Sequence, residues 1–460
     1  MQVVLINPYE LGRQPLGLAH PAAWLQQAGW TVHCVDLSLQ KLADAPLADA
    51  DLIGLYVPMH TATRIAIEAL PRIRERAPNA YLCVYGLYAP MNAALLRAQG
   101  ASAILGGEFE PALLALAREL EAGRRAPRDT VVALKKIAFR VPARDGLPPL
   151  ARYAHLRLPT GARRVVGFVE ATRGCKHLCR HCPVVPVYQG QFRVLPLEIV
   201  MADIRQQMAG GAQHISFGDP DFLNGPAHAL RIVEALHQEF PAVTYDATIK
   251  IQHILDRADL LPALKRTGCL FITTAVESVD DAVLDRLAKN HTAADFARAT
   301  ELLRAHAIDF APTFVPFTPW TTLESYIALL RSLVDLKLVE AVAPVQLSIR
   351  LLVPQGSLLL ELPDFATHIG AFDAGLLGYP WRHADARVDA LQREVQSFVA
   401  SVETAGQTRA EIFAGIWQGA HAAVGATAPA LPQDLGTPVP HMSEPWYCCA
   451  EPTAQQLQSF

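Results

Sequence analysis

The sequence is short of the features that mark several broad classes of protein. Its 460 residues contain 8 cysteines, too few for a disulfide framework in a chain of this length. The formal net charge is -4 and the pI is about 6.5, so no basic excess argues for a nucleic acid partner. No apolar run is long enough to span a bilayer, and no charged start leads into an apolar secretory segment. We therefore expect a cytoplasmic protein of two or three domains, with neither a nucleic acid nor a membrane as partner.

The sequence also lacks a GxGxxG motif after its first expected strand, so a dinucleotide site is unsupported. Five short apolar segments nevertheless alternate with helical patterns, at residues 2–7, 31–36, 51–56, 80–85 and 103–106. Apolar strands separated by helices predict a buried, doubly wound parallel sheet. Ligands of such sheets lie at the carboxyl ends of the strands, which here carry Asn7, His60 and Gly106.

Three cysteines lie close together in a CxxxCxxC loop, Cys175, Cys179 and Cys182. A tetrahedral zinc site or a closed iron-sulfur cluster needs four protein ligands, whereas three thiolates leave one iron of a cubane unclaimed. An open iron can bind a substrate. The alternative is a zinc knuckle that takes His177 or His181 as its fourth ligand.

The residues around this loop suit a negatively charged cluster. Residues 165–170 are expected to form a strand that runs into the loop, and Gly174 would let the backbone approach the cluster closely. Arg173, Lys176 and Arg180 place positive charge beside it. The imidazoles of His177 and His181 are candidate hydrogen-bond donors to its sulfurs. A solvated basic loop is the simpler alternative for each of these residues.

The CxxxCxxC loop resembles that of the radical S-adenosylmethionine (radical SAM) superfamily. In that family the free iron chelates the amino and carboxylate groups of SAM, and electron transfer from the cluster breaks a carbon-sulfur bond. The resemblance implies that the three cysteines hold a [4Fe-4S] cluster, with SAM as second cofactor and a small molecule as substrate. It also implies a reduced flavodoxin or ferredoxin-type electron donor. It covers residues 1 to about 360 and implies a partial TIM barrel of six strands, the last near residues 346–357, with the chemistry at their carboxyl ends.

The resemblance also assigns candidate cofactor-binding residues to the strand ends. The stretch from Gly218 to Gly225 is similar to the family's second-strand motif, which holds the SAM ammonium, and ammonium groups need acceptors such as carboxylates. A later strand end matches the position where family members contact the SAM ribose and methionine part. Lys250 and Arg350 could each pair with a carboxylate of SAM or of the substrate. The alternatives are a salt bridge at the barrel rim for Lys250 and a purely structural role for Arg350. These candidates are Gly218, Asp219, Asp221, Glu277, Ser278, Lys250 and Arg350.

The N-terminal segment resembles the cobalamin-binding-type domain that precedes many radical SAM domains. The resemblance runs from Asn7-Pro8 through Leu16-Gly-Leu18 to Gly106-Gly-Glu108. The cobalt-ligating pattern Asp-x-His-x-x-Gly is absent, because His20, His33 and His60 have no Asp two residues earlier. The resemblance therefore implies either cobalamin bound without a histidine ligand or a domain that serves as scaffold.

The C-terminal part combines helical patterns with an unusual pair of cysteines. Apolar stripes at residues 388–402 and 412–417 predict two core helices, and a Pro-rich connector follows. A disulfide between the neighbours Cys448 and Cys449 would make a strained ring, so we interpret them as a soft-ligand pair, a redox pair or a point of covalent attachment, or as inert thiols. The ending Cys-Cys-Ala-Glu-Pro resembles the CUAEP/CCAEP-tail radical SAM family, which makes the pair candidate catalytic residues. A sister group includes the enzyme that builds an arsenic-containing amino acid, but its fuller cysteine motif is absent here.

Together these patterns predict an α/β chain in four parts. Residues 1–123 are expected to form a Rossmann-like, cobalamin-binding-type domain, 124–163 a linker, 164–384 a partial radical SAM barrel, and 385–460 the C-terminal helices, connector and tail. The expected function is reductive cleavage of SAM to start radical chemistry on an unidentified substrate. The alternatives are a cobalamin-dependent radical SAM methyltransferase, 3-amino-3-carboxypropyl transfer to arsenic or another soft element held by the tail, and a non-catalytic iron-sulfur or zinc sensor.

Overall fold

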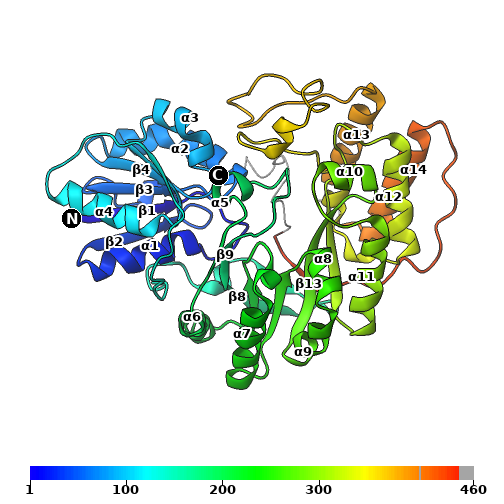
Figure 1. Ribbon diagram of the computed structural model, residues 1–460, viewed down its shortest axis with the longest axis horizontal. Coiled ribbons are helices and arrows are strands. Elements are labelled where there is room, and N and C mark those ends of the chain that lie inside the picture. The colour runs from blue at the N-terminus through cyan, green and yellow to red at the C-terminus, as the bar shows by residue number, and fades with distance from the viewer. Residues whose placement is uncertain (404–405, 445–460) are drawn as a thin grey trace.

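The computed structural model describes residues 1–403 and 406–444. Figure 1 shows two α/β bodies side by side, an N-terminal one in blue and cyan and a larger one in green and yellow. The C-terminal helices α13 (Ala386–Glu403) and α14 (Arg409–Ala423) lie on the outer side of the larger body. Within the described ranges, no helix combines the length and the apolar character needed to cross a membrane.

Six parallel strands form the N-terminal sheet, in the order β2-β1-β3-β4-β5-β6. Alternate residues of the first strand enter different cores, because side chains along a strand point to opposite faces. Val4 and Ile6 pack on the face covered by α2, while Val3 and Leu5 pack on the face of α1 and α4. Both faces are therefore covered, which confirms the doubly wound prediction. The elements are β1 (Gln2–Asn7), α1 (Leu16–Gln27), β2 (Thr31–Asp36), β3 (Leu52–Tyr56), α2 (His60–Arg76), β4 (Tyr81–Tyr85), α3 (Ala93–Ala98), β5 (Ala103–Gly107), α4 (Glu110–Glu121) and β6 (Thr130–Ala133).

The second body is built on a seven-stranded sheet in the order β14-β13-β12-β11-β8-β7-β15. Five of its strands are parallel, namely β8 (Arg163–Val169), β11 (His214–Phe217), β12 (Thr244–Thr248), β13 (Cys269–Glu277) and β14 (Asp309–Phe314). Helices alternate with them, namely α6 (Leu197–Ala209), α7 (Pro226–Glu239), α8 (Ile251–Asp256), α9 (Leu261–Arg266), α10 (Asp281–Arg286), α11 (Ala293–Ala305) and α12 (Leu323–Asp335). The parallel strands place their carboxyl ends at one rim, as the barrel prediction requires.

The expected sixth barrel strand is reduced to a single bridge. Pro344–Leu347 forms a 3-10 turn, and one parallel bridge between Phe317 and Arg350 continues the sheet beyond β14. Pro316 stands on one side of this gap and Pro344 on the other, and proline has no N–H to donate to a ladder. The prediction of six full strands was therefore wrong by one.

The segment expected to be a linker contributes a strand to each sheet. β6 extends the first sheet beside β5, and β7 (His155–Arg157) pairs antiparallel with β8 in the second. Between these two strands lies the buried Arg144. Its guanidinium donates to the Asp203 carboxylate at 2.9 and 2.7 Å, to the Phe168 carbonyl at 2.8 Å and to Gln14 Oε1 at 2.9 Å. Residues 124–163 thus bind both bodies together.

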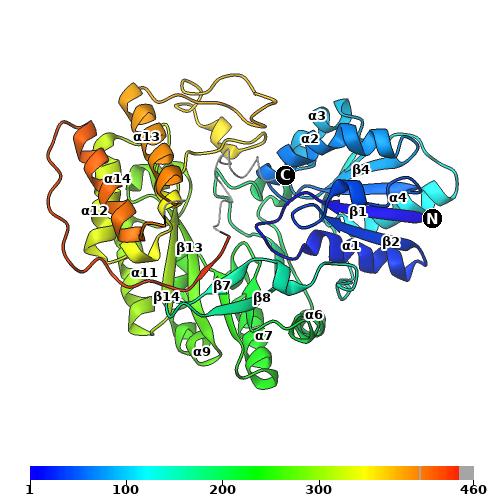
Figure 2. The same cartoon turned by 180° about the vertical axis from the view of Figure 1, so that it is seen from behind.

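The C-terminal helices join the barrel core as their stripes predicted. Val388, Leu391, Ile412 and Trp417 are buried in the same core as the strands of the second sheet. After α14 the chain crosses behind the barrel, the red segment of Figure 2, and reaches β15 (His441–Met442), which pairs with β7. The two residues after β15 are the last described ones, and both contact the N-terminal half of the chain. Ser443 N donates to the His155 carbonyl at 2.8 Å, and the Glu444 carboxylate accepts from the Tyr9 hydroxyl.

Candidate active site

The cysteine loop starts at a turn that requires glycine. After β8, the short strand β9 (Thr172–Gly174) pairs with β10 (Phe192–Val194) and runs into Cys175. Gly174 has φ +78°, and a Cβ there would lie 2.5 Å from the Tyr188 ring and 2.6 Å from the Gln191 carbonyl. Gly174 therefore brings the backbone close to the protein on its other side, whereas the sequence suggested a close approach to the cluster.

The three thiols of the loop are sheltered from water. Cys175 is 9% exposed, Cys179 is 7% exposed and Cys182 is half-buried. Burial raises the pKa of the Cys175 thiol, whose Sγ lies 3.8 Å from Asn224 Oδ1. The buried ammonium of Lys250 lies 3.6 Å from Cys179 Sγ. The thiolate is the form of cysteine that binds iron, and an ammonium beside it would offset its negative charge.

A second buried ion pair lies at the end of β13. Glu277 has φ +71° and its carboxylate contacts His181 Nε2 at 3.0 Å and Lys289 Nζ at 3.3 Å. Burial alone raises the pKa of Glu277, but Lys289 and His181 outweigh it and hold the pKa at about 2. Ser278 follows, and its hydroxyl accepts from the Asp280 backbone N–H at 3.0 Å. Glu277 thus fixes His181, a residue of the cysteine loop, to the rim of the barrel.

The Gly218–Asp221 loop lies beside the cysteines and is held by internal contacts. Gly218 packs so closely on Phe168 that a Cβ at this position would lie 2.4 Å from the ring. Asp219 accepts from the Ala171 backbone N–H at 2.9 Å and from the Thr172 hydroxyl at 2.5 Å. Both of its oxygens therefore fix the turn ahead of the cysteine loop, and burial raises its pKa to about 7.

Asp221 is the meeting point of two imidazoles. Its Oδ2 lies 3.1 Å from His177 Nε2 and 2.7 Å from His253 Nδ1, and Oδ1 caps the Leu223 backbone N–H at 3.3 Å. Burial alone raises the pKa of this carboxyl, but the two histidines outweigh it and hold the pKa at about 2. His177 was expected to face the cluster sulfurs, whereas here its Nε2 lies against Asp221.

Two other basic residues of the region, Arg350 and Arg180, are engaged with protein groups. Arg350 donates to Asp389 Oδ1 at 2.7 Å and lies 3.5 Å over the Trp381 ring, so it ties the barrel to α13. Arg180 donates to the carbonyls of Asp285 and Arg286 at 3.0 and 2.9 Å. These contacts match the structural alternative for Arg350 and anchor the cysteine loop to α10 through Arg180.

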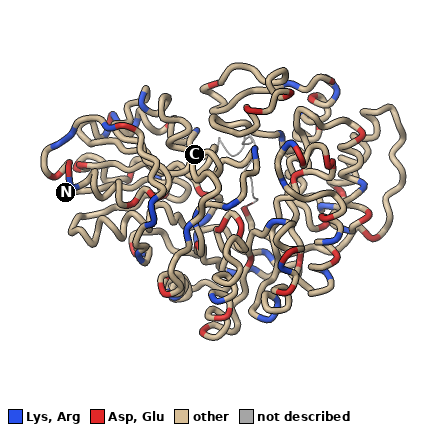
Figure 3. The backbone as a smooth tube through the Cα atoms, viewed as in Figure 1, with Lys and Arg blue, Asp and Glu red and all other residues tan. Residues whose placement is uncertain are grey.

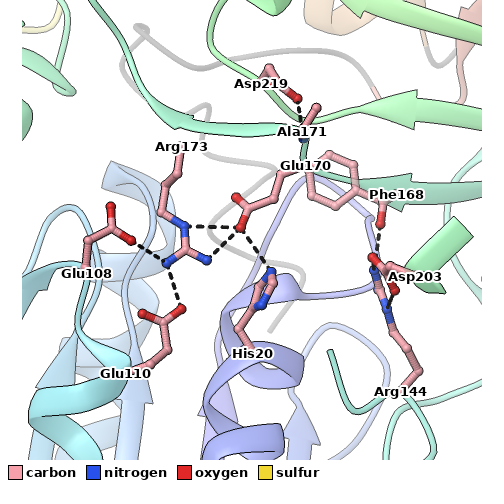
Figure 4. Close-up of polar contacts among 10 residues, drawn as sticks. All are labelled: His20, Glu108, Glu110, Arg144, Phe168, Glu170, Ala171, Arg173, Asp203 and Asp219. Carbon is pink, nitrogen blue, oxygen red and sulfur yellow. Dashed lines mark hydrogen bonds and ion pairs between the residues drawn. The ribbon is translucent and has the colours of Figure 1, made fainter. Parts of the chain in front are cut away.

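Arg173 points toward Glu108 and Glu110 of the N-terminal body, as Figure 4 shows. Its guanidinium contacts Glu108 at 3.1 Å, Glu110 at 2.7 Å and Glu170 at 2.6 Å. Glu170 also contacts His20 Nε2 at 3.0 Å. Burial raises the pKa of Glu108 to about 7 despite Arg173. Sequence reasoning expected Arg173 beside the cluster and Glu108 at a strand end. It did not predict that these two residues form an ion pair.

A cavity of about 190 Å³ lies between the two bodies, next to this network. Carboxylates and aromatic rings from both bodies line it, including Glu10, His20, Tyr56, Phe109, Glu170, Arg173 and Tyr188. Small-molecule sites usually enclose roughly 300–1,000 Å³, and a corrin is larger than most such ligands. The enclosed part of this cavity is smaller than that range, so a corrin would extend beyond it.

The strand-end residues expected around cobalamin contact other groups of the protein. Asn7 Nδ2 donates to Asp36 Oδ1 at 3.1 Å. His60 Nε2 lies 2.5 Å from the Leu376 carbonyl, and burial lowers the His60 pKa to about 4. A Cβ at Gly106 would lie 2.3 Å from Pro90.

The tail pair Cys448 and Cys449 lies outside the described residues. The described chain ends at Glu444, whose carboxylate accepts from Tyr9 on the loop after β1. A Cβ at Gly12 of the same loop would lie 3.3 Å from Glu444 Cβ. The last described residue therefore lies beside the loop that also supplies Glu10 to the cavity.

Residues 169–330 match the sequence model of the family described as "Radical SAM superfamily". Hopanoid C-3 methylase of Methylococcus capsulatus is 25% identical over 313 residues, which cover 62% of this chain and 59% of that protein. Anaerobic magnesium-protoporphyrin IX monomethyl ester cyclase of Synechocystis is 24% identical over 348 residues, 68% of either chain. The chain thus spans about 59% to 68% of the length of these two curated relatives.

Two solved structures share the arrangement of both bodies. The cobalamin-dependent S-adenosylmethionine radical enzyme OxsB, described with aqua-cobalamin and SAM bound, superposes with TM-score 0.68 at 15% identity and covers 87% of this chain and 67% of its own. The radical SAM methyltransferase TsrM of Kitasatospora setae, with tryptophan and a SAM analogue, has TM-score 0.58 at 18% identity and covers 73% and 71%. These likenesses establish the fold, a parallel α/β sheet followed by a radical SAM-type partial barrel.

Proposed function

We propose that this chain is a radical SAM enzyme in which Cys175, Cys179 and Cys182 hold a [4Fe-4S] cluster and SAM binds its open iron. One observation carries the proposal. Three sheltered thiols lie on one loop at the carboxyl end of the first barrel strand, with Lys250 3.6 Å from one of them. The match of residues 169–330 to the radical SAM superfamily supports the same chemistry.

The spacing of the thiols favours a cluster over a zinc knuckle. Zn–S bonds of about 2.3 Å in a tetrahedron would bring the sulfurs to about 3.8 Å from one another. Among the described residues, the ligand atoms of His177, Asp221 and His253 all lie within 4.8 Å of one another. The three cysteine sulfurs are not brought that close together. A fourth thiol is not supplied by Cys269, which lies at the amino end of β13, opposite the rim that carries the loop.

The chain's own residues prepare the site in three ways. Lys250 and the loop cysteines provide a buried cation beside thiolates. Asp219 fixes residues 171 and 172, and Glu277 fixes His181, so the loop is held from two neighbouring strand ends. When bound, the reduced cluster supplies the electron that cleaves a carbon-sulfur bond of SAM and leaves a carbon-centred radical for the substrate.

We place SAM across the carboxyl ends of β11, β12 and β13. Asp219 and Asp221 both already accept hydrogen bonds within the protein, so in this placement the strand-end carbonyls receive the SAM ammonium and the two carboxylates hold the surrounding loop. Lys250 pairs with the SAM carboxylate, and Ser278 meets the ribose. Arg350 is engaged with Asp389 and Trp381 and takes no part.

The proposal extends to the tail, in which Cys448 and Cys449 take part in turnover directly or by holding the substrate. Supporting this, the described chain ends at Glu444, bound to the loop after β1 that borders the cavity between the bodies. Two adjacent thiols suit a soft acceptor, as carboxypropyl transfer to arsenic would need. Methyl transfer through cobalamin is the second candidate, favoured by the likeness to OxsB and TsrM.

The test is anaerobic reconstitution with iron, sulfide and SAM. Wild type should hold four irons and four sulfides and convert SAM to 5′-deoxyadenosine or methylthioadenosine, which report different bond cleavages. The triple change Cys175→Ala, Cys179→Ala, Cys182→Ala should remove both. The matched control changes three other buried cysteines, Cys34→Ala, Cys83→Ala and Cys269→Ala, and should keep the cluster. A cluster that survives in the first variant refutes the assignment, and a cluster without SAM turnover leaves the sensor alternative.

A further inference from the structure

Two histidines and one aspartate meet beside the cysteine loop, and they come from three separate segments. His177 lies in the loop itself, Asp221 follows β11, and His253 lies on α8. Their side chains are 16%, 0% and 8% exposed. The three ligand atoms, His177 Nε2, Asp221 Oδ2 and His253 Nδ1, all lie within 4.8 Å of one another. The fold thus gathers two imidazoles and one carboxylate at a sheltered point, which we call the His-Asp-His group.

Hydrogen bonding accounts for only part of the His-Asp-His group. His177 Nε2 has hydrogen-bonding geometry to Asp221 Oδ2, at 3.1 Å. His253 Nδ1 lies closer to the same oxygen, at 2.7 Å, yet no hydrogen bond joins the two atoms, and this buried nitrogen has no hydrogen-bond partner. A buried polar atom without a partner costs free energy and needs an explanation. A nitrogen so close to an oxygen without a hydrogen bond between them is arranged as two ligands of one cation are, because both lone pairs then point at the cation.

The distances and the donor atoms suit zinc. Zn–N and Zn–O bonds are about 2.0–2.2 Å long, which separates neighbouring ligand atoms of a tetrahedron by about 3.4 Å. The two separations that involve Asp221 Oδ2, 3.1 and 2.7 Å, come within reach of that value by small side-chain rotations. The other oxygen, Oδ1, accepts from the Leu223 backbone N–H at 3.3 Å, and carboxylates that bind metals are commonly fixed by such a hydrogen bond.

The surrounding charge also bears on which cation would bind. Over the described part of the larger body, Lys and Arg are interspersed with Asp and Glu, as Figure 3 shows, so no broad acidic region surrounds the group. Lys250 adds a positive charge near His177. A cation would therefore be held by direct bonds to the three ligands. Such bonding favours zinc, which imidazole binds well, over calcium and magnesium, which prefer oxygen ligands.

We propose that the His-Asp-His group binds one zinc ion, separate from the iron-sulfur cluster. This inference goes beyond the proposed function and does not depend on it, because none of the three ligands is a cysteine. Three protein ligands with a fourth position open are the pattern of catalytic zinc sites. At the open position, a carbonyl or carboxylate oxygen of a small molecule would take the place of water. The ion would also tie the cysteine loop, through His177, to α8, through His253.

The experiment measures zinc binding to cluster-loaded protein and to protein without the loop thiols. The first is wild type after anaerobic reconstitution with iron and sulfide, and the second carries Cys175→Ala, Cys179→Ala and Cys182→Ala. Each is dialysed against zinc alone, and bound zinc is counted by mass spectrometry of the metals. The test variant, made in both proteins, is His253→Gln, which offers no imidazole. The matched control, His228→Gln, changes another buried histidine, on α7.

Both parent proteins should bind one zinc per chain. His253→Gln should weaken zinc binding at least about 100-fold, because losing even an outer partner of a metal ligand costs about 10–100-fold. The control should bind zinc as its parent does. Cobalt(II) in the same site should give the visible bands of nitrogen and oxygen ligands without the charge-transfer band of a thiolate. Circular dichroism checks folding, and His253→Leu replaces the test variant if His253→Gln does not fold.

Four results would overturn the zinc proposal. These are cluster-loaded wild type without bound zinc, unchanged zinc binding in His253→Gln, equal loss in the control, and a cobalt-thiolate band, which would show that cysteines hold the metal. The two proposals fail separately. If wild type forms no cluster but binds zinc through His253, the proposed function fails and the zinc site stands. If wild type forms a cluster that turns over SAM and binds no zinc, the proposed function stands and the zinc site fails.

Discussion

Replacing Arg173 by methionine should loosen the contact between the two bodies, because it removes one cation from among three carboxylates. The guanidinium is 11% exposed, and Glu108 and Glu110 are 0% and 1% exposed. Methionine keeps much of the volume of the side chain, so the loss is electrostatic. Breaking a buried ion pair by removing one partner costs about 3–5 kcal/mol. We expect Arg173→Met to lower the free energy of unfolding by an amount in that range.

A compensating variant separates this effect from lost packing. Adding Glu108→Gln and Glu110→Gln to Arg173→Met removes two of the stranded charges, and should recover at least about half of the loss. Such recovery is the non-additive behaviour expected of residues in one ion-pair network. The measurement is urea unfolding of all three proteins at pH 8, followed by fluorescence and by circular dichroism to detect separate unfolding of the two bodies.

The pH dependence gives a further check on the same variant. Burial raises the pKa of Glu108 from 4.5 to about 7, so the folded protein holds a proton that the unfolded chain releases. This group therefore lowers stability as the pH rises from about 4.5 to 7. Without Arg173 the Glu108 pKa rises further, so the deficit of Arg173→Met should be larger at pH 8 than at pH 5.5. A loss of unfolding free energy below about 1 kcal/mol in Arg173→Met at pH 8 would refute this account. So would a triple variant that is less stable than Arg173→Met alone.

Three other predictions concern the cluster, the cavity and the tail. Gly174→Ala should cut the iron content after reconstitution by more than half, because its Cβ would meet Tyr188 and the Gln191 carbonyl at φ +78°; full iron content would contradict the clash. If the second candidate function holds, hydroxocobalamin titrated into the protein should form a complex with a shifted absorption spectrum and no histidine ligand; an unchanged spectrum would remove the methyltransferase candidate. Cys448→Ala with Cys449→Ala should keep the cluster and SAM cleavage but lose product; product formed at the wild-type rate would make the tail a bystander.

Local patterns were enough to predict the frame of the molecule. The strands of the N-terminal sheet were predictable because each is an uninterrupted apolar segment, and Val3 to Ile6 indeed serve two cores in alternation. The C-terminal helices were predictable from stripes such as Val388 and Leu391. The cysteine loop was predictable because its three cysteines are close in sequence, so its recognition needed no knowledge of tertiary contacts.

What could not be predicted depends on partners distant in the chain. Arg173 lies on β9, just before the cysteines, yet its partners Glu108 and Glu110 belong to the other body, 65 and 63 residues away. Arg350 was a candidate ligand for SAM, but it binds Asp389, 39 residues later. The direction of a long cationic side chain is set by which carboxylates the fold brings near, and no spacing in the sequence encodes that.

The two strands contributed by residues 124–163 have a consequence for dividing the chain. A barrel cut out at residue 164 would lack β7, so the outer edge of β8 would present unpaired backbone groups, and β15 would have no strand to pair with. The N-terminal body cut at residue 123 would lack β6 and expose the edge of β5. Open sheet edges pair readily with other chains and promote aggregation. The smallest unit that keeps these sheet edges paired is therefore both sheets together, because each body is completed by a strand from the segment they share.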